Sequence, residues 1–269
     1  MPLFHLVLVA LIQGVTEFLP VSSSGHLVLL PALTGMEDQG QVIDVAAHVG
    51  TLFAVVLFFW SDVRSAIAGL GRLIRGKVDT QGAWLALCLV IATVPVVIAG
   101  AILKLTGLSD ALRSVAVIGW TMILFGILLY WADQRAVQVK SQRELSLKDA
   151  ARLGLWQVLA LIPGTSRSGI TITGALVHGY TRIDGTRIAM LMSIPTIIAS
   201  GVLSSLDLIG GTVPLRDAGI VVILSFLAAL VALALMMRLL RTVSFTPYVI
   251  YRVLLGVVLL GLVYTGTFS

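Results

Sequence analysis

The sequence predicts an all-α polytopic membrane protein that forms a single integral membrane domain over residues 1–269. Of these residues 58% are hydrophobic and 12% are charged, whereas a soluble domain is about half apolar and about a quarter charged. Apolar stretches of about 20 residues, the length that crosses a bilayer, recur along almost the whole chain. The net charge of +5 comes from basic residues in loops. That pattern is typical of cytoplasmic loops and gives no reason to expect nucleic acid as a partner.

Eight apolar stretches follow one another along the chain, and six of them are continuous. These six predict transmembrane helices at 43–60, 84–104, 115–133, 188–208, 216–238 and 248–267. The other two, 4–35 and 151–178, are interrupted by proline, glycine and serine, which predicts a helix–loop–helix hairpin in each. Broken backbone at membrane depth is tolerated only where protein buries it or where it lines a wet cavity.

The distribution of lysine and arginine favours hairpins that enter and leave the membrane on the same side. If both broken stretches are re-entrant and the N-terminus lies outside, 13 basic residues fall in inside loops and 3 in outside loops. A strong excess of basic residues on the inside is the usual arrangement. In this topology the first hairpin enters from outside and the second from inside, so the two tips meet near the midplane.

The two broken stretches also resemble each other at a constant offset of 144 residues. Leu11 matches Leu155, and Gln13 matches Gln157; Ser22, Ser24 and Gly25 match Ser166, Ser168 and Gly169. Together with the opposite sides of insertion, this match predicts an inverted repeat, in which the functional site lies at the interface of the repeats.

The first broken stretch carries polar groups with a catalytic character. Gln13 and Glu17 are four residues apart and share one helix face, and ionisable groups inside a membrane mark functional sites by default. Pro20 is expected to end the first half-helix, and the serines after it can cap the next. Ser23 and His26 lie three apart, which places a hydroxyl beside an imidazole, the minimal unit for nucleophilic catalysis. A buried structural histidine and an interfacial glutamate are the alternatives.

The second broken stretch, PGTSRSG at residues 163–169, is typical of an anion site. N–H groups at the start of a helix favour negative charge, and the planar fork of Arg167 suits phosphate. Thr171 follows Arg167 by four residues and is expected to reach the same anion. The alternative is a structural ion pair between Arg167 and an internal carboxylate such as Glu17. Facing each other, the two breaks suit a phosphate ester and a divalent metal held by a carboxylate and the substrate phosphates.

The chain resembles the bacterial undecaprenyl-diphosphate phosphatase family, the membrane enzymes associated with bacitracin resistance. The motifs QGVTEFLPVSSSGH (13–26) and PGTSRSG (163–169) carry the resemblance, and length and segment pattern agree over nearly the whole chain. The family implies hydrolysis of the C55 isoprenoid diphosphate carrier to the monophosphate, recycled for peptidoglycan synthesis in the cell wall and hence for cell shape. It also implies antibiotic resistance, a divalent metal (Mg²⁺ or Ca²⁺), and a site in the bacterial inner membrane that opens to the outer face.

Transferred to this sequence, the resemblance implies four catalytic residues, Glu17, Ser23, His26 and Arg167, with Glu17 also on the metal side. Ser23 would be the nucleophile, or would give way to an activated water, and His26 the general base or acid. Substrate-binding positions would be Gln13, Ser22, Ser24, Ser166, Ser168 and Thr171. Gln13 departs from the glutamate of many members and leaves one carboxylate fewer for the metal.

The competing function is a secondary transporter or lipid flippase. Inverted repeats, broken helices and a midplane polar site describe transporters equally well, but a transporter needs no nucleophile and no phosphate loss. The pair Asp44 and His48 either extends the site or lies at its membrane entrance, the second being favoured. A homodimer is left open.

Overall fold

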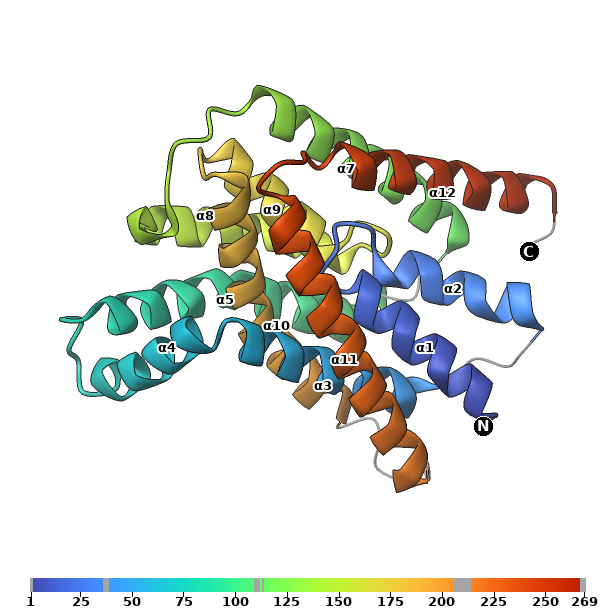
Figure 1. Cartoon of the computed structure of the whole chain (residues 1–269), viewed down its shortest axis with the longest axis horizontal. Coiled ribbons are helices and arrows are strands. Elements are labelled where there is room, and N and C mark those ends of the chain that lie inside the picture. The colour runs from blue at the N-terminus through green and yellow to red at the C-terminus, as the bar shows by residue number, and fades with distance from the viewer. Residues whose placement is uncertain (1, 36–38, 109–111, 113, 206–213, 267–269) are drawn as a thin grey trace.

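The computed structural model describes residues 2–35, 39–108, 112, 114–205 and 214–266, and the regular elements in these ranges are helices. An isolated bridge between Lys140 and Tyr180 is the one β-type contact among them. The helices pack into a single bundle of antiparallel and crossing rods (Figure 1). The all-α architecture predicted from the sequence is therefore confirmed.

Six helices are long and apolar enough to cross a membrane, and each coincides with one of the six continuous apolar stretches. They are α3 (Gln41–Phe58), α5 (Gln81–Thr106), α7 (Val115–Arg135), α10 (Arg182–Ser205), α11 (Leu215–Leu239) and α12 (Thr246–Tyr264). At a rise of about 1.5 Å per residue, helices of this length match a hydrocarbon core of about 30 Å. The chain is thus a multi-pass membrane protein with the six spans expected.

The two interrupted stretches form pairs of shorter helices. The first consists of α1 (Leu3–Thr16) and α2 (Ser23–Thr34), and Figure 1 shows α2 turning back beside α1. The second consists of α8 (Leu147–Val158), a 3-10 turn at Leu159–Leu161, and α9 (Arg167–Val177). A helix of 14 residues or fewer is at most about 21 Å long, which is shorter than the thickness of the hydrocarbon core, about 30 Å. The helix breaks are confirmed, and insertion from opposite sides stays a prediction.

Two details differ from expectation. The helix α1 ends at Thr16, with Glu17 as its C-cap, rather than continuing to Pro20. The predicted inside loop 61–82 contains a further helix, α4 (Trp60–Leu73). Gly69 of α4 approaches Gly82 of α5 so closely that a Cβ on Gly69 would lie 2.2 Å from the carbonyl carbon of Gly82. This contact needs glycine, and it packs α4 antiparallel on α5.

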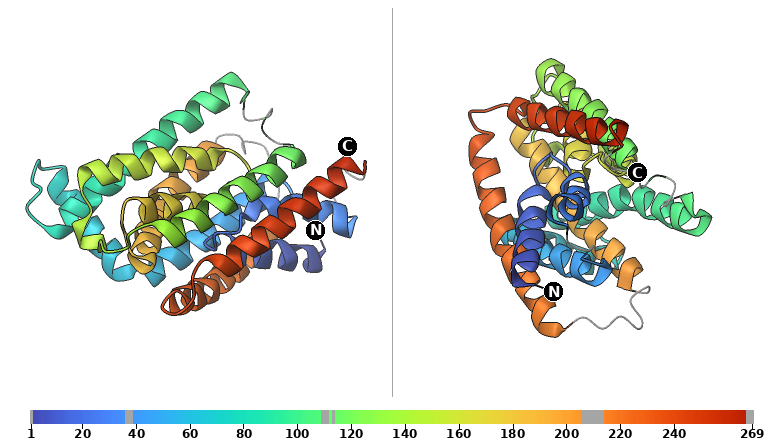
Figure 2. Two further views of the ribbon diagram at one scale, coloured as in Figure 1. Left: turned by 90° about the horizontal axis from the view of Figure 1, so that it is seen from above. Right: turned by 90° about the vertical axis from the view of Figure 1, so that its right-hand side faces the viewer.

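Small residues let the spans around the first broken stretch approach one another. A Cβ on Gly14 of α1 would lie 2.7 Å from the Ser225 carbonyl oxygen, and one on Gly50 of α3 would lie 2.3 Å from that of Val222. Both carbonyls belong to α11, which crosses α1 and α3 (Figures 1 and 2). Small residues at such crossings are the usual basis of helix packing in lipid. The second broken stretch packs likewise, with Gly154 of α8 against Ala92 of α5.

The outer face of the bundle is apolar. On α11 the exposed side chains recur at helical spacing, with Leu227 51%, Val231 59% and Leu235 54% exposed, while Ser225 and Ala229 on the opposite face are fully buried. An apolar surface this extensive is typical of contact with lipid. The polar groups of the chain are turned inward, towards the place where the two helix breaks meet.

Candidate active site

The two helix breaks adopt the same unusual backbone conformation at matched positions. Ser22 has φ 71° and ψ 101°, and Ser166 has φ 68° and ψ 113°. They are the two non-glycine residues with positive φ in the described chain, and they are 144 residues apart. Such conformations cost about 1–3 kcal/mol each and persist only where the surroundings impose them. The match supports the internal repeat expected from the sequence.

Side-chain contacts follow the same repeat. The Ser22 and Ser24 hydroxyls lie 3.0 Å apart, and those of Ser166 and Ser168 lie 3.1 Å apart. Each break also binds the backbone of the other. The Gly164 N–H donates to Ser24 Oγ (3.2 Å), and the Ser168 hydroxyl donates to the Leu19 carbonyl (3.0 Å). The structure thus brings the two predicted motifs into direct contact, with Ser22, Ser24, Ser166 and Ser168 at the junction.

Glu17 is the centre of the site. Its carboxylate accepts hydrogen bonds from Gln13 Nε2 (2.8 Å) and from the Ser23 hydroxyl (3.1 Å), both at Oε2. Its other oxygen, Oε1, pairs with the Arg167 guanidinium. The side chain is only 8% exposed, so these partners replace the water that a charged carboxylate would otherwise require.

Arg167 connects the site to α10. Its Nη2 pairs with Glu17, and its Nη1 donates to the Ser193 carbonyl at 3.0 Å. The ion pair that the sequence left as an alternative is therefore formed. It does not prevent a role in binding, because both side chains also line the cavity described next.

A cavity of about 230 Å³ opens at the junction of the two breaks. The residues of the breaks that line it include Glu17, Ser23, Ser24, Gly164, Ser166 and Arg167. Ser22 lines it as well, so a carboxylate, four serine hydroxyls and a guanidinium of the two breaks converge on one space. Ser166 and Arg167 also begin α9, where N–H groups and the helix dipole favour an anion. The cavity suits a phosphate group.

His48 of α3 belongs to the same cavity, although the sequence placed it more readily at the membrane entrance. Its Nδ1 donates to the Asp44 carbonyl at 2.8 Å, and its Nε2 lies 3.8 Å from Glu17 Oε2. The i, i+4 spacing of Asp44 and His48 was the available signal. Which face of α3 meets the break depends on the packing of α3 against its neighbours.

His26 occupies a different environment from the one expected. Its Nδ1 donates to the Ser22 carbonyl (2.7 Å), so Nε2 of the neutral ring accepts from the Tyr251 hydroxyl at 2.6 Å. The two rings stack with centroids 5.5 Å apart. Because both ring nitrogens are engaged, His26 is not poised to take a proton from Ser23. The expected Ser23–His26 pair is not among the hydrogen bonds of the described residues, and Ser23 is paired with Glu17 instead.

Two residues of α12 were missed by the sequence analysis, Tyr251 and Arg252. Arg252 is fully buried, and its guanidinium contacts the backbone of both breaks. The signal was present, since an arginine within the apolar stretch 248–267 requires internal partners. Thr171, by contrast, was expected to contact the anion. It is buried, its hydroxyl has no partner among the described residues, and it is not among the residues that line the cavity.

The donor set at the site suits a divalent cation only if the substrate contributes ligands. No group of three or more His, Cys, Asp or Glu side chains converges anywhere in the described chain. Glu17 supplies one carboxylate, and Gln13 Oε1 is a buried acceptor without a partner. Mg²⁺ in phosphate-processing sites typically uses one or two carboxylates, with waters and substrate phosphates as the other ligands. Glu17 fits that pattern, whereas Gln13 hydrogen-bonds Glu17 but is not among the residues that line the cavity.

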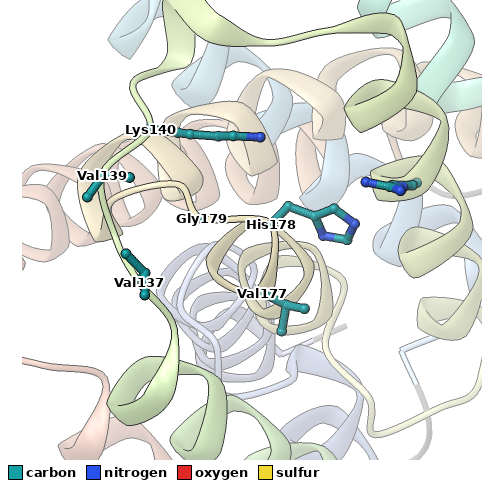
Figure 3. Close-up of a pocket in the computed structure, with 7 residues that line it drawn as sticks. Val137, Val139, Lys140, Val177, His178 and Gly179 are labelled. Carbon is teal, nitrogen blue, oxygen red and sulfur yellow. The ribbon is translucent and has the colours of Figure 1, made fainter.

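A wider cavity of about 750 Å³ lies elsewhere, between the 137–140 segment and the end of α9 (Figure 3). Lys140, Arg152 and His178 line it together with valines. Lys140 is already paired with Asp149 at 3.3 Å. This cavity shares no residue with the Glu17 cluster and has no carboxylate or hydroxyl in its lining, so the smaller cavity is the candidate active site.

The sequence is similar to known proteins over nearly its whole length. An undecaprenyl-diphosphatase of Ruegeria pomeroyi is 68% identical over 267 residues, which cover 98% of this chain and 100% of that protein. The undecaprenyl-diphosphatase of Dinoroseobacter shibae is 66% identical with the same coverage. That of Saccharophagus degradans is 44% identical and covers 98% of this chain and 99% of its own. Residues 6–258 match the family described as bacitracin resistance protein BacA, and the chain belongs to that family.

Proposed function

We propose that this protein hydrolyses undecaprenyl diphosphate to undecaprenyl phosphate and inorganic phosphate. The observation that carries the proposal is the meeting of Glu17, Ser23 and Arg167 in one cavity at the junction of the two helix breaks. Full-length relatives at up to 68% identity are undecaprenyl-diphosphatases. The lipid tail would lie along the apolar surface while the diphosphate occupies the cavity.

The geometry favours Glu17 over His26 as the proton acceptor. In the proposed reaction Ser23 Oγ attacks the terminal phosphorus, and its proton passes to Glu17 Oε2, which already accepts that hydroxyl. The bond between the terminal phosphorus and the bridging oxygen breaks, and undecaprenyl phosphate leaves with the electron pair. Water then hydrolyses the phosphoserine and releases phosphate. Direct attack by a water held by Glu17 is the variant of this mechanism.

Arg167 and the start of α9 stabilise the negative charge that moves to the bridging oxygen. Phosphoryl transfer depends mainly on positioning and charge neutralisation, and removing a single donor of this kind costs about 2.7–4 kcal/mol of transition-state binding. Arg167 is held for this task by Glu17 and by the Ser193 carbonyl. The pairing with Glu17 therefore orients the guanidinium before the substrate binds.

Metal dependence is part of the proposal. Glu17, with Gln13 hydrogen-bonded to its carboxylate, would hold Mg²⁺ or Ca²⁺ together with the diphosphate, and the cation would supply further neutralisation of the phosphate oxygens. The protein would act in the bacterial cytoplasmic membrane, with the site open to the outer face. The excess of basic residues in one set of loops supports a topology with these loops inside and the N-terminus outside.

Phosphate release from farnesyl diphosphate in detergent tests the function. Wild type should release inorganic phosphate, chelator should abolish release, and added Mg²⁺ or Ca²⁺ should restore it. Glu17→Ala and Arg167→Ala should lose at least about 100-fold in kcat/KM, whereas Arg241→Ala on the exposed loop should not. Folded wild type without phosphate release would favour the transporter alternative.

Trapping experiments separate the two mechanisms. If Ser23 is the nucleophile, rapid quenching should reveal phosphoserine at Ser23, and Ser23→Ala should lower kcat by at least about 10³-fold. Ser24→Ala is the comparison, because Ser24 lines the same cavity but bonds the Gly164 N–H; whatever its effect on rate, this variant should still form phosphoserine at Ser23. Near-full activity in Ser23→Ala would leave water as the nucleophile.

A further inference from the structure

Arg252 has an environment that neither the sequence nor the proposed chemistry explains. Its side chain is fully buried on α12, and it is the largest fully buried side chain of the described chain. No carboxylate pairs with it among the residues that the structure describes. A buried guanidinium is costly unless its hydrogen bonds are made. Its partners must therefore account for its presence.

The partners are backbone carbonyls of both helix breaks. Nη1 donates to the Pro20 carbonyl (3.4 Å), in the first break. Nη2 donates to the carbonyls of Gly164 (3.1 Å) and Thr165 (2.8 Å), in the second break. Carbonyls freed where a helix is interrupted lack their usual partners. Arg252 satisfies three of them, and its two η-nitrogens are divided between the two motifs.

These contacts act on the two strained positions. The Thr165 carbonyl belongs to the same planar trans peptide as the Ser166 N–H, so holding the oxygen at Arg252 directs that N–H the opposite way. Pro20 lies two residues before Ser22. The positive φ of Ser166 therefore adjoins a peptide that Arg252 holds, and the positive φ of Ser22 lies one peptide beyond the Pro20–Val21 peptide that Arg252 holds. Gly169, in the first turn of α9, leaves room for this arrangement, since a Cβ there would lie 2.8 Å from Nη1.

We infer that Arg252 is a positioning residue for the proposed reaction, which fixes the two helix breaks relative to each other and orients the peptides that begin α9. It does not line the cavity, so it acts through Glu17, Ser23 and Arg167 rather than on the substrate. One fork that bridges both motifs keeps the carboxylate and hydroxyl of the first break aligned with the guanidinium and N–H groups of the second. The inference rests on the proposed phosphatase activity.

Two substitutions separate positioning from charge. Arg252→Met keeps the length and apolar packing of the side chain but removes every donor. Arg252→Lys keeps the positive charge, but a single ammonium nitrogen cannot take the places of two η-nitrogens that serve different breaks. We expect kcat with farnesyl diphosphate to fall at least 100-fold in Arg252→Met and at least tenfold in Arg252→Lys, with KM changed less than fivefold in both.

Hydrogen exchange supplies a readout that does not depend on activity. Exchange in peptides covering 16–26 and 162–170 should rise at least tenfold in Arg252→Met, while exchange within α5 and α11 stays within twofold of wild type. Arg182→Met is the matched control. Arg182 donates to Asp133 at 2.5 Å, and Asp133 also accepts the Phe245 N–H ahead of α12, so this variant loosens the start of α12 away from the breaks. Arg182→Met should leave kcat within threefold of wild type and hydrogen exchange in the two helix breaks within twofold of wild type.

The outcomes are decisive in each direction. Folded Arg252→Met or Arg252→Lys with wild-type kcat would overturn the inference, as would an equal rise in exchange over the whole chain. A parallel effect of Arg182→Met on the breaks would also overturn it. If wild type released no phosphate, the proposed function would fail instead, and the exchange data would still test whether Arg252 holds the two breaks together.

Discussion

The ion pair between Glu17 and Arg167 permits a quantitative test of how the two helix breaks are held together. We propose a double-mutant cycle with Glu17→Gln, Arg167→Met and the double variant. The two side chains are 8% and 16% exposed, so each single substitution leaves a buried charge without its partner. Breaking a buried pair in this way costs about 3–5 kcal/mol. The double variant removes both charges and should recover much of that loss.

The expected magnitude follows from the burial. Opposite charges about 4 Å apart attract by about 4 kcal/mol at an effective dielectric constant of about 20, in line with the cost of breaking a buried pair. For a protein of this size, 1 kcal/mol shifts the unfolding midpoint by about 2–4 °C. Each single variant should therefore unfold about 6–20 °C below wild type. The double variant should lose much less stability than the sum of the two single losses. The difference, the coupling energy, should be about 2–3 kcal/mol.

Thermal unfolding in detergent, followed by tryptophan fluorescence, measures the cycle. The pair of Arg187 and Asp62 is the control, because it is bidentate in its geometry but more exposed, its side chains being 38% and 13% exposed. Its coupling should be smaller, about 1 kcal/mol or less. Strictly additive losses for Glu17 and Arg167 would show that the pair does not hold the breaks together, and would refute this account of the site.

Three further predictions concern the surroundings of the site. Tyr251→Phe should lower the free energy of unfolding by about 1 kcal/mol, since it removes a hydrogen bond to His26; because the geometry assigns proton transfer to Glu17, kcat should stay close to wild type, and a large loss of kcat would contradict that assignment. Gly50→Val should lower stability by about 3 kcal/mol or more through overpacking against α11, whereas Gly261→Val on the open face of α12 should change it little; equal thermal midpoints would contradict the close crossing. In the first turn of α8, burial raises the pKa of Asp149, but hydrogen bonds from Tyr180, Ser146 and Lys140 outweigh it and hold this pKa below the ordinary 3.8. The stability lost in Asp149→Asn should therefore be full at pH 7 and shrink as the pH falls below 3.8, and a loss that is the same at pH 7 and pH 3 would be the contrary result.

Much of the fold was accessible from the sequence because lipid imposes simple rules. Each of the six continuous apolar stretches is a helix, since a segment in hydrocarbon must satisfy its backbone internally. The proline, glycine and serine clusters marked both breaks for the same reason. The helix α4 was missed because its mixed polar and apolar residues resemble a basic loop, although Val63, Ala66 and Gly69 recur at helical spacing and form its buried face.

The site was predictable in composition but not in pairing. Glu17, Ser23 and Arg167 were identified from charge and hydroxyl groups in apolar surroundings, and the structure brings all three to one cavity. The partner of Ser23 was expected to be His26 from their spacing. In the structure the Ser23 hydroxyl bonds Glu17 instead, and the His26 imidazole is hydrogen-bonded to Tyr251 of α12, 225 residues away in sequence. Local spacing carries no information on such a partner.

The sequence by itself determined that this protein is a six-span membrane protein with two interrupted helices and an anion-binding chemistry. Burial of polar groups in lipid is costly enough that few other interpretations remain. Only the tertiary structure decided which groups face one another. The pairing of Glu17 with Arg167 and the bridge of Arg252 across both breaks depend on helix crossings between segments more than 100 residues apart. The position of His48 beside Glu17 depends on the rotation of α3. Packing sets both the crossings and the rotation, and no local sequence pattern encodes them.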